Sequence, residues 1–228
     1  MAAALVIFDC DGVLVDSEAI AIEVMRTALA RLGLPLDAAA VHRRFLGRSL
    51  ASTVADLAAG GIVFDERAQR EMARELRVRF DAELAPVPGI AGVIDRLAVP
   101  CCVASSSDMG RLRRSLRTAG LLERFGEAVF SADEVARGKP APDLFLHAAA
   151  RMGVAPADCV VIEDSVPGLL AAAAAGMGAV AFAGGSHLAD EEGRAALAAH
   201  AGALVTRADD LARHLPMGPA VAAGGGAT

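Results

Sequence analysis

The sequence has no tryptophan and no tyrosine, and it contains a single lysine, Lys139. Acidic residues outnumber basic ones, 28 to 22, which gives a formal net charge of −6. This balance leaves no broad basic face for binding nucleic acid or an anionic membrane surface, so we expect neither partner. Because arginine supplies nearly all of the positive charge, the one lysine stands out as a position where an ammonium group was retained.

Long apolar runs are also missing. The N-terminal run ends at Asp9 and is far shorter than the roughly 20 residues of a membrane-spanning helix. It also lacks the basic region and cleavage site of a secretory signal. The cysteines lie in or beside apolar runs, without the spacing of metal ligands: Cys10, Cys101, Cys102 and Cys159. We therefore expect free thiols and a reducing, cytoplasmic location.

Short apolar runs alternate with helical stretches along most of the 228 residues. Strands are predicted at residues 4–8, 101–105, 128–131, 159–162, 179–183 and 203–206. Helices are predicted between them at residues 107–119, 143–152 and 166–175, each followed by a glycine. This alternation predicts an α/β fold with a Rossmann-like open parallel sheet and crossover helices. Such sheets bind ligands at the carboxyl ends of their strands.

One segment breaks the alternation. Residues 16–83 contain only helical patterns, at 18–31, 37–45, 50–59 and 66–80. We expect this segment to form an inserted all-helical domain, whereas residues 1–15 and 84–215 form the catalytic core. The glycine-rich tail at residues 216–228 is expected to be disordered.

Chemically reactive side chains stand at the ends of predicted strands or, for Lys139, in the stretch Gly138-Lys139-Pro140. In chain order they are Asp9, Asp11, Ser105, Lys139, Glu163 and Asp164. Because the carboxyl ends of parallel strands meet at one edge of a sheet, we expect these groups to lie together. A nucleophilic acid, a hydroxyl group, one cation and an acidic pair are typical of a magnesium-phosphate site.

These motifs resemble the four motifs of the haloacid dehalogenase superfamily: Asp9-x-Asp11-Gly12, Ser105, Lys139-Pro140 and Glu163-Asp164. The helical insertion resembles the C1-type cap of that superfamily. The stretches Asp11-Gly-Val-Leu-Val-Asp-Ser-Glu18 and Gly138-Lys-Pro-Ala-Pro-Asp143 resemble its phosphatase and β-phosphoglucomutase branch, subfamily IA. The likeness covers nearly the whole chain in order and spacing.

The resemblance implies a Mg²⁺-dependent phosphomonoesterase for a small phosphorylated metabolite: a sugar, sugar-acid or polyol phosphate. Asp9 would form an aspartyl-phosphate, and Asp11 would act as the acid and then the base. Ser105, the backbone N–H of Ser106 and Lys139 would bind the phosphoryl group. Gly12 would allow a tight backbone turn beside them.

The resemblance also implies a metal site. The Mg²⁺ ligands would be Asp9, the backbone carbonyl of Asp11 and Asp164, with Glu163 binding directly or through water.

Two serines that follow the second predicted strand, Ser106 and Ser107, are expected to cap the helix after it.

Three arginines, Arg43, Arg44 and Arg48, belong to a stretch that resembles the cap's specificity loop. One hypothesis is that Arg48 or a neighbour binds a carboxylate or second anionic group of the substrate. An exposed basic helix end explains the same residues equally well. His187 follows the fifth strand and could approach the site, and the sequence leaves its role open.

Three alternatives stay open. A β-phosphoglucomutase-like mutase shares the fold and nucleophile, but the places of its cap histidine and arginine hold Ala21 and Leu50. A dehalogenase lacks the second acid that Asp11 supplies. A phosphoacceptor receiver module carries its acceptor on a middle strand and has no helical cap. The sequence predicts a monomer or a homodimer without choosing between them.

Overall fold

We analysed a computed structural model of the chain, which describes residues 3–45, 50–188 and 191–218. The central sheet has six parallel strands: β1 (Leu5–Phe8), β2 (Cys101–Ser105), β3 (Val129–Ser131), β4 (Cys159–Glu163), β5 (Gly178–Phe182) and β6 (Leu204–Val205). Their order in the sheet is β3-β2-β1-β4-β5-β6. The predicted α/β fold is confirmed, and each strand lies within two residues of its predicted ends.

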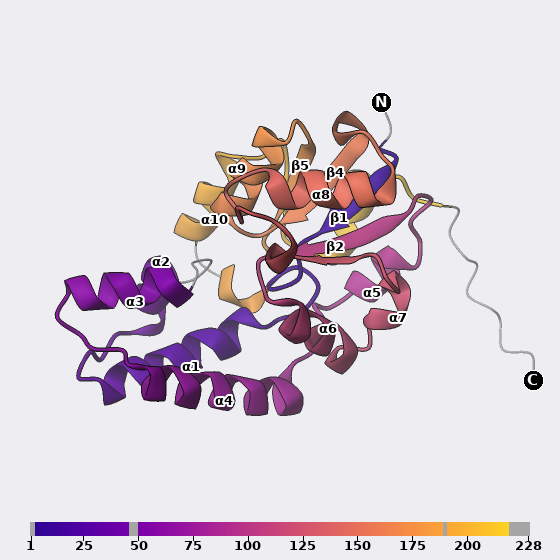
Figure 1. Cartoon of the computed structure of the whole chain (residues 1–228). Coiled ribbons are helices and arrows are strands. Elements are labelled where there is room, and N and C mark those ends of the chain that lie inside the picture. Colours follow the sequence, from indigo (N-terminus) through magenta and orange to yellow (C-terminus); the bar gives the residue numbers. More distant parts are fainter. Residues whose placement is uncertain (1–2, 46–49, 189–190, 219–228) are drawn as a thin grey trace, which may run out of the picture.

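Helices cover both faces of this sheet (Figure 1). One face packs on α5 (Ile90–Ile94), α6 (Met109–Thr118) and α7 (Leu122–Phe125), and the other on α8 (Asp143–Met152) and α9 (Val166–Ala174). Because strand residues alternate, Val6 and Phe8 enter the first core and Leu5 and Ile7 the second. With both faces buried, β1 is apolar along its whole length.

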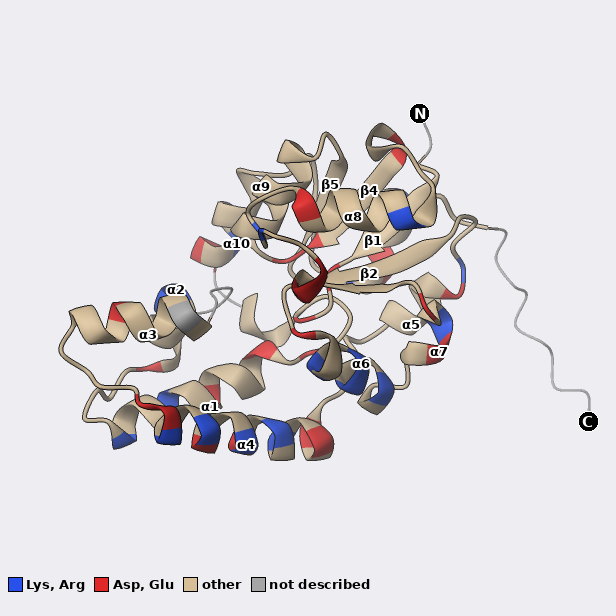
Figure 2. Cartoon of the chain, in the orientation of Figure 1, with Lys and Arg blue, Asp and Glu red and all other residues tan. Residues whose placement is uncertain are grey.

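The insertion after β1 is helical, as predicted. It contains α1 (Glu18–Arg31), α2 (Ala38–Phe45), α3 (Leu50–Ala59) and α4 (Glu66–Glu83). These helices enclose an apolar cluster of their own, which includes Leu29, Val41 and Leu57. The outer face of α4 carries alternating charges (Figure 2), with i,i+4 ion pairs such as Arg67–Glu71. The outer face of α4 is therefore exposed to solvent, and the helices of the insertion pack together through their other faces.

Two adjacent connections join the insertion to the sheet. Val15 forms an antiparallel bridge with Pro86, and the backbone N–H of Asp16 donates to the carbonyl of Ala85 at 3.0 Å. The base of the insertion also shares the core beneath the sheet, because Phe80 of α4 belongs to the same buried cluster as Phe8. The insertion is thus joined to the sheet through a paired backbone, and its base packs on apolar side chains.

The remaining part of the chain contains elements that the sequence pattern did not reveal. These are the short helices α5 and α7, helix α10 (Glu191–Ala198) and, among the described residues, four short 3₁₀ turns, at Ala132–Glu134, Pro156–Asp158, Ser186–Leu188 and Ala208–Arg213. The start of the predicted disordered tail is different in the structure: Met217 forms a bridge with Leu97, and the N–H of Ala98 donates to the carbonyl of Pro216. Main-chain pairing therefore holds residues 216–218, and residues 219–228 lie outside the described part.

All four cysteines are free thiols, as expected. Within the described residues, no helix combines the length and the apolar character needed to cross a bilayer.

Candidate active site

The predicted groups gather at the carboxyl edge of the sheet. Asp9 directly follows β1, Ser105 ends β2 and Glu163 ends β4. β1 lies between β2 and β4, where the strand order changes direction, and the N–H of Asp9 donates to the carbonyl of Ile162 at 3.0 Å. The sheet therefore delivers these side chains to the position where open α/β sheets bind ligands.

Lys139 reaches this edge from the segment between β3 and α8. Its Nζ donates to Oδ1 of Asp9 at 2.5 Å, to Oε1 of Glu163 at 2.7 Å and to the carbonyl of Ala104 at 3.1 Å. Burial alone would lower the pKa of Lys139, but the negative charges of Asp9 and Glu163 outweigh it and raise the pKa. The single lysine is thus a buried, permanently charged group in contact with the predicted nucleophile.

Glu163 is buried at the end of β4, where donors contact both of its oxygens. Its Oε1 accepts from Lys139, and its Oε2 accepts from both the N–H and the hydroxyl group of Ser165 at 2.8 Å. A Cβ on Gly168 would lie 1.8 Å from Oε1, so α9 packs directly against this carboxylate. Glu163 therefore holds Lys139 in place, and its predicted role as a metal ligand, directly or through water, stays a prediction.

Asp11 is held by three side-chain donors, one just before α1 and two in or just before α6. Its Oδ1 accepts from Ser17 at 2.6 Å and from Arg111 at 3.1 Å, and its Oδ2 accepts from Ser107 at 2.7 Å. Burial alone would raise the pKa of Asp11, but the charge of Arg111 and the hydroxyl hydrogen bonds outweigh it and lower the pKa. Asp11 is therefore an ionised carboxylate whose orientation is fixed by the start of α1 and by α6.

The serines after β2 divide their roles differently from the prediction. Ser105 is buried, and its Oγ accepts from the N–H of Ser107 at 3.1 Å. Helix α6 is capped by Asp108, which accepts from the N–H of Arg111, so neither Ser106 nor Ser107 is the cap residue. The Asp108 carboxylate, one residue nearer the helix than Ser107, accepts from a free N–H group of the first turn. The Ser107 hydroxyl group is therefore left to bind Asp11.

Asp9 and Asp164 are two further buried carboxylates at this edge. Burial raises the pKa of Asp9, Lys139 opposes the rise, and the charges of Glu163 and Asp164 add to it. The pKa of Asp164 is raised by burial and by the charge of Glu163. One lysine therefore does not neutralise this concentration of negative charge, and a bound divalent cation would do so.

The donor set fits Mg²⁺. Among the described residues, no three His, Cys, Asp or Glu side chains converge tightly enough to hold a metal by themselves. Two carboxylates, Asp9 and Asp164, together with the carbonyl of Asp11, make an oxygen-only set that water completes, as Mg²⁺ prefers. Gly12 has a φ of +78°, and a Cβ there would lie 1.8 Å from Oδ2 of Asp164. This glycine lets Asp164 pack against the turn that presents the Asp11 carbonyl.

The basic residues of the insertion separate into different environments. Arg44 forms an ion pair with Asp56 at 2.7 Å, which holds α2 to α3. Arg43 is exposed and lines a pocket that is described below. Arg48 lies outside the described residues, so its predicted role stays a prediction.

Some residues of the site were not predicted from the sequence. Ser17 and Glu18 lie inside the first motif, and their position just before and at the start of α1 could have drawn attention to them. Arg111 is one of several arginines on α6, and the sequence gives no sign that it alone reaches Asp11. His187, whose role the sequence left open, is buried with its Nε2 3.2 Å from Oδ2 of Asp164.

A pocket of about 280 Å³ opens beside Asp164, between the insertion and the core. It is lined from the insertion by Glu18, His42 and Arg43 and from the core by His187 and apolar residues. Burial raises the pKa of Glu18 to about 8, and the charges of Asp11 and Asp164 add to this effect. The pocket can therefore offer a neutral carboxyl group, imidazole rings and a guanidinium group to a polar ligand.

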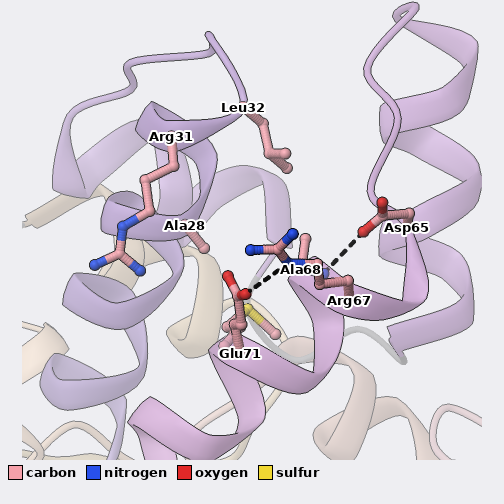
Figure 3. Close-up of a pocket in the computed structure, with 8 residues that line it drawn as sticks. Ala28, Arg31, Leu32, Asp65, Arg67, Ala68 and Glu71 are labelled. Carbon is pink, nitrogen blue, oxygen red and sulfur yellow. Dashed lines mark hydrogen bonds and ion pairs between the residues drawn. The ribbon is translucent and has the colours of Figure 1, made fainter.

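A second depression, of about 300 Å³, lies between α1 and α4 (Figure 3). Its charged side chains include Arg31, Asp65, Arg67 and Glu71. Arg67 pairs with Glu71 at 2.9 Å, and Asp65 caps α4. None of the residues gathered at the sheet edge lines it, so it is a feature of the insertion surface and not part of the candidate site.

Comparisons with known proteins agree with this geometry. Residues 3–176 match the family model of the haloacid dehalogenase-like hydrolases. The chain is 32% identical to the 6-phosphogluconate phosphatase of Escherichia coli over 184 residues, which cover 80% of this chain and 83% of that one. It is 34% identical to the fructose-1-phosphate phosphatase of the same organism over 177 residues, covering 76% and 93%.

A solved structure extends the likeness to the whole fold. The haloacid dehalogenase-like protein ATU0790 from Agrobacterium tumefaciens superposes with a TM-score of 0.84 at 34% identity, over 93% of this chain and 97% of that one. The chain therefore belongs to the haloacid dehalogenase-like hydrolases, and within them to the phosphatases, which hydrolyse phosphomonoesters.

Proposed function

We propose that this protein is a Mg²⁺-dependent phosphomonoesterase that hydrolyses a small phosphorylated metabolite through an aspartyl-phosphate on Asp9. One observation carries the proposal. The Asp9 carboxylate lies at the carboxyl end of the central strand and is bound by the buried Lys139. Ser105 ends the neighbouring strand β2, and Asp11 follows Asp9 in the chain. A buried nucleophile held by a cation is suited to attack an anionic phosphoryl group.

In the first step, an oxygen of Asp9 attacks phosphorus in line with the ester oxygen. The bond between phosphorus and the ester oxygen breaks, and Asp11 donates a proton to the ester oxygen, so the alcohol leaves. The hydroxyl group of Ser105, the N–H of Ser106 and the ammonium group of Lys139 bind the phosphoryl oxygens. In the second step, water attacks phosphorus, Asp11 accepts its proton, and the bond to Asp9 breaks to release phosphate.

The lowered pKa of Asp11 suits the second step, because a base must be ionised before it accepts a proton. In the first step Asp11 must carry a proton, and the negative charge of an arriving phosphate favours protonation. Arg111, Ser17 and Ser107 hold the carboxylate in both steps and limit its movement.

Mg²⁺, bound by Asp9, Asp164 and the carbonyl of Asp11, would supply positive charge that offsets the phosphoryl oxygens and the surrounding carboxylates. Glu163 supports this arrangement from behind by holding Lys139.

The pocket beside Asp164 supports a sugar, sugar-acid or polyol phosphate as the substrate. Glu18, His42 and Arg43 line it, and such groups bind hydroxyl groups and carboxylates. Its volume of about 280 Å³ suits a small metabolite. The two relatives from Escherichia coli, which act on 6-phosphogluconate and fructose 1-phosphate, favour the same class.

We also infer that residues 16–83 act as a cap on a core formed by residues 1–15 and 84–215. The paired connections at Val15–Pro86 and Asp16–Ala85 are suited to a hinge, because the chain enters and leaves the insertion at adjacent points. Closing the cap would exclude water from the phosphoryl group.

A mutase that shares this nucleophile would return the phosphoryl group to a sugar. The positions of the mutase's cap histidine and arginine hold Ala21 and Leu50, and Leu50 is 46% exposed. Neither side chain can transfer a proton or bind a second phosphate, so these residues favour hydrolysis.

The test is phosphate release with Mg²⁺ across a panel of 6-phosphogluconate, fructose 1-phosphate, glycerol phosphate and p-nitrophenyl phosphate. Wild type should release phosphate, most efficiently from one of the metabolites, and the near-isosteric Asp9→Asn protein should release almost none. Circular dichroism checks that the variant is folded. Equal rates in the two proteins would overturn the mechanism, and interconversion of sugar phosphates without phosphate release would favour the mutase.

A further inference from the structure

His187 occupies a position between the core and the cap. It lies in the 3₁₀ turn Ser186–Leu188 after β5, and its side chain is only 3% exposed. Nε2 lies 3.2 Å from Oδ2 of Asp164. Its ring also contacts the imidazole of His42 on α2, at 5.6 Å between ring centroids and with the planes at 78°. One side chain thus touches both a predicted metal ligand and the cap.

The backbone around His187 is shaped to allow this placement. A Cβ on Gly12 would lie 2.8 Å from Cε1 of His187, and a Cβ on Gly185 would lie 2.8 Å from its Nδ1 and 2.9 Å from the carbonyl oxygen of Gly12. Ordinary side chains at either position would therefore displace the imidazole ring. Two glycines from separate loops leave the space that it fills.

The turn that carries His187 is also tied to the hinge. The N–H and the hydroxyl group of Ser186 both donate to Oδ1 of Asp16, at 3.1 Å and 2.9 Å. Asp16 in turn pairs with the second connection through the carbonyl of Ala85. The imidazole is therefore fixed from its own turn, from the first motif and from the cap, as expected of a group whose orientation matters.

We propose that His187 is a positioning residue that orients Asp164 for Mg²⁺ binding. With Nε2 beside Oδ2, the imidazole limits the rotation of the Asp164 carboxylate and so sets its orientation toward the metal. The proposal rests on the proposed Mg²⁺ site. Groups that orient metal ligands in this way typically change metal affinity by about 10–100-fold when they are removed.

The ring itself has no part in the proposed proton transfers, which Asp11 performs. Its effect is therefore expected on metal binding and not on the chemical step. In the His187→Ala enzyme, the Mg²⁺ concentration for half-maximal rate should therefore rise by about 10–100-fold.

The direct test is calorimetric titration of Mg²⁺ into the resting full-length enzyme, without substrate. His187→Ala should weaken Mg²⁺ binding by about 10–100-fold. His187→Gln, whose amide N–H can reach the same oxygen, should recover most of the affinity. His147→Ala is the matched control, because His147 is also partly buried and lies 3.7 Å from an acid, Glu134, but away from the site. It should bind Mg²⁺ as wild type does.

The outcomes separate this inference from the proposed function. If wild type binds Mg²⁺ and hydrolyses phosphomonoesters but His187→Ala binds Mg²⁺ with unchanged affinity, the positioning role is wrong and the proposed function stands. If wild type neither binds Mg²⁺ nor releases phosphate, the proposed function itself fails. A thermal shift in the His187 variants without a change in Mg²⁺ affinity would assign His187 a purely structural role and overturn the inference.

Discussion

Lys139 shows how one residue can determine the character of the site. It is the only lysine in the chain, and its ammonium group contacts the carboxylates of Asp9 and Glu163 and the carbonyl of Ala104. A compact point charge can meet three oxygens from three directions, whereas a planar guanidinium group cannot. Arginine replaces lysine elsewhere in this protein, but the geometry at position 139 requires an ammonium group.

Replacing Lys139 with methionine should therefore damage both stability and catalysis. The buried pair Asp9 and Glu163 would lose its cation, and breaking such a pair typically costs about 3–5 kcal/mol of unfolding free energy. Loss of a group that binds the phosphoryl oxygens should lower kcat by about 10²–10³-fold. Urea unfolding and phosphate release measure the two effects.

Lys139→Arg is the informative comparison, because it keeps the charge and changes only its shape. We expect it to be folded but nearly as inactive as the methionine variant. Wild-type activity in Lys139→Arg would show that the shape of the cation is unimportant.

Glu18 gives the site a predictable pH dependence. Its pKa is raised to about 8 from an ordinary 4.5. Between these values the folded protein binds a proton that the unfolded chain releases, so this group makes the protein less stable as pH rises through that window. Glu18→Gln removes the titration. In metal-free protein with EDTA, the Tm of Glu18→Gln should exceed that of wild type by an amount that grows from pH 5 to pH 9.

The comparison is made without metal, because a bound cation would itself change the pKa of nearby carboxyl groups. Two Tm curves that run parallel over this pH range would show that the pKa of Glu18 is not raised.

At the scale of elements, α9 supports the catalytic edge from behind. Gly168 lies in its first turn, and a Cβ there would come 1.8 Å from Oε1 of Glu163. The helix can therefore pack against this carboxylate only because the position has no side chain. Glu163 in turn orients Lys139, so the packing of one helix determines where the cation lies.

Gly168→Ala should therefore impair catalysis although it removes no reactive group. We expect a loss of about 1–3 kcal/mol of stability from overpacking, with a fall in kcat as Glu163 and Lys139 shift. The matched control is Gly92→Ala in α5, where a Cβ would meet nothing within 4 Å. That variant should be active and as stable as wild type or slightly more so.

Chemical denaturation and steady-state kinetics of the two alanine variants give the answer. If Gly168→Ala had the same kcat as Gly92→Ala, the packing of α9 would not determine the geometry of Lys139.

The elements themselves were largely predictable from the sequence. β1 is continuously apolar because both faces of the sheet are covered, and α1 and α8 have the predicted bounds because periodic apolar residues and glycine stops mark them. The short α5 and α7 were missed, since 5 and 4 residues are too few to show a helical period. α10 was missed as well, because few of its 8 residues are large and apolar.

The site was predictable where chemistry follows strand ends and unpredictable where it depends on contacts across the fold. Asp9 and Ser105 were expected to lie together because the topology brings strand ends to one edge, and Lys139 was expected there from its motif Gly138-Lys139-Pro140. The partners of Asp11 were not identified, because Arg111 reaches it from 100 residues away in the sequence. The sequence also could not show that Lys139 and Ser165 contact the carboxylate of Glu163, whose role as a metal ligand stays a prediction.

For the whole molecule, the site is a joint property of the core and the cap. The core supplies the nucleophile and the acidic residues, and the cap adds Glu18, His42 and Arg43 around the pocket beside Asp164. The acidic net charge of −6 includes these buried carboxylates, so part of it lies at the edge of the sheet and not on the solvated surface.

The central claim is that the phosphoryl group passes through Asp9. Its most direct test is rapid acid quenching of the enzyme with ³²P-labelled substrate and Mg²⁺, followed by mapping of the labelled peptide. Wild type should carry label on the peptide that contains Asp9, stable to acid and released by hydroxylamine as an acyl phosphate is, and Asp9→Asn should carry none. Label on another residue, or undiminished phosphate release by Asp9→Asn, would contradict the account.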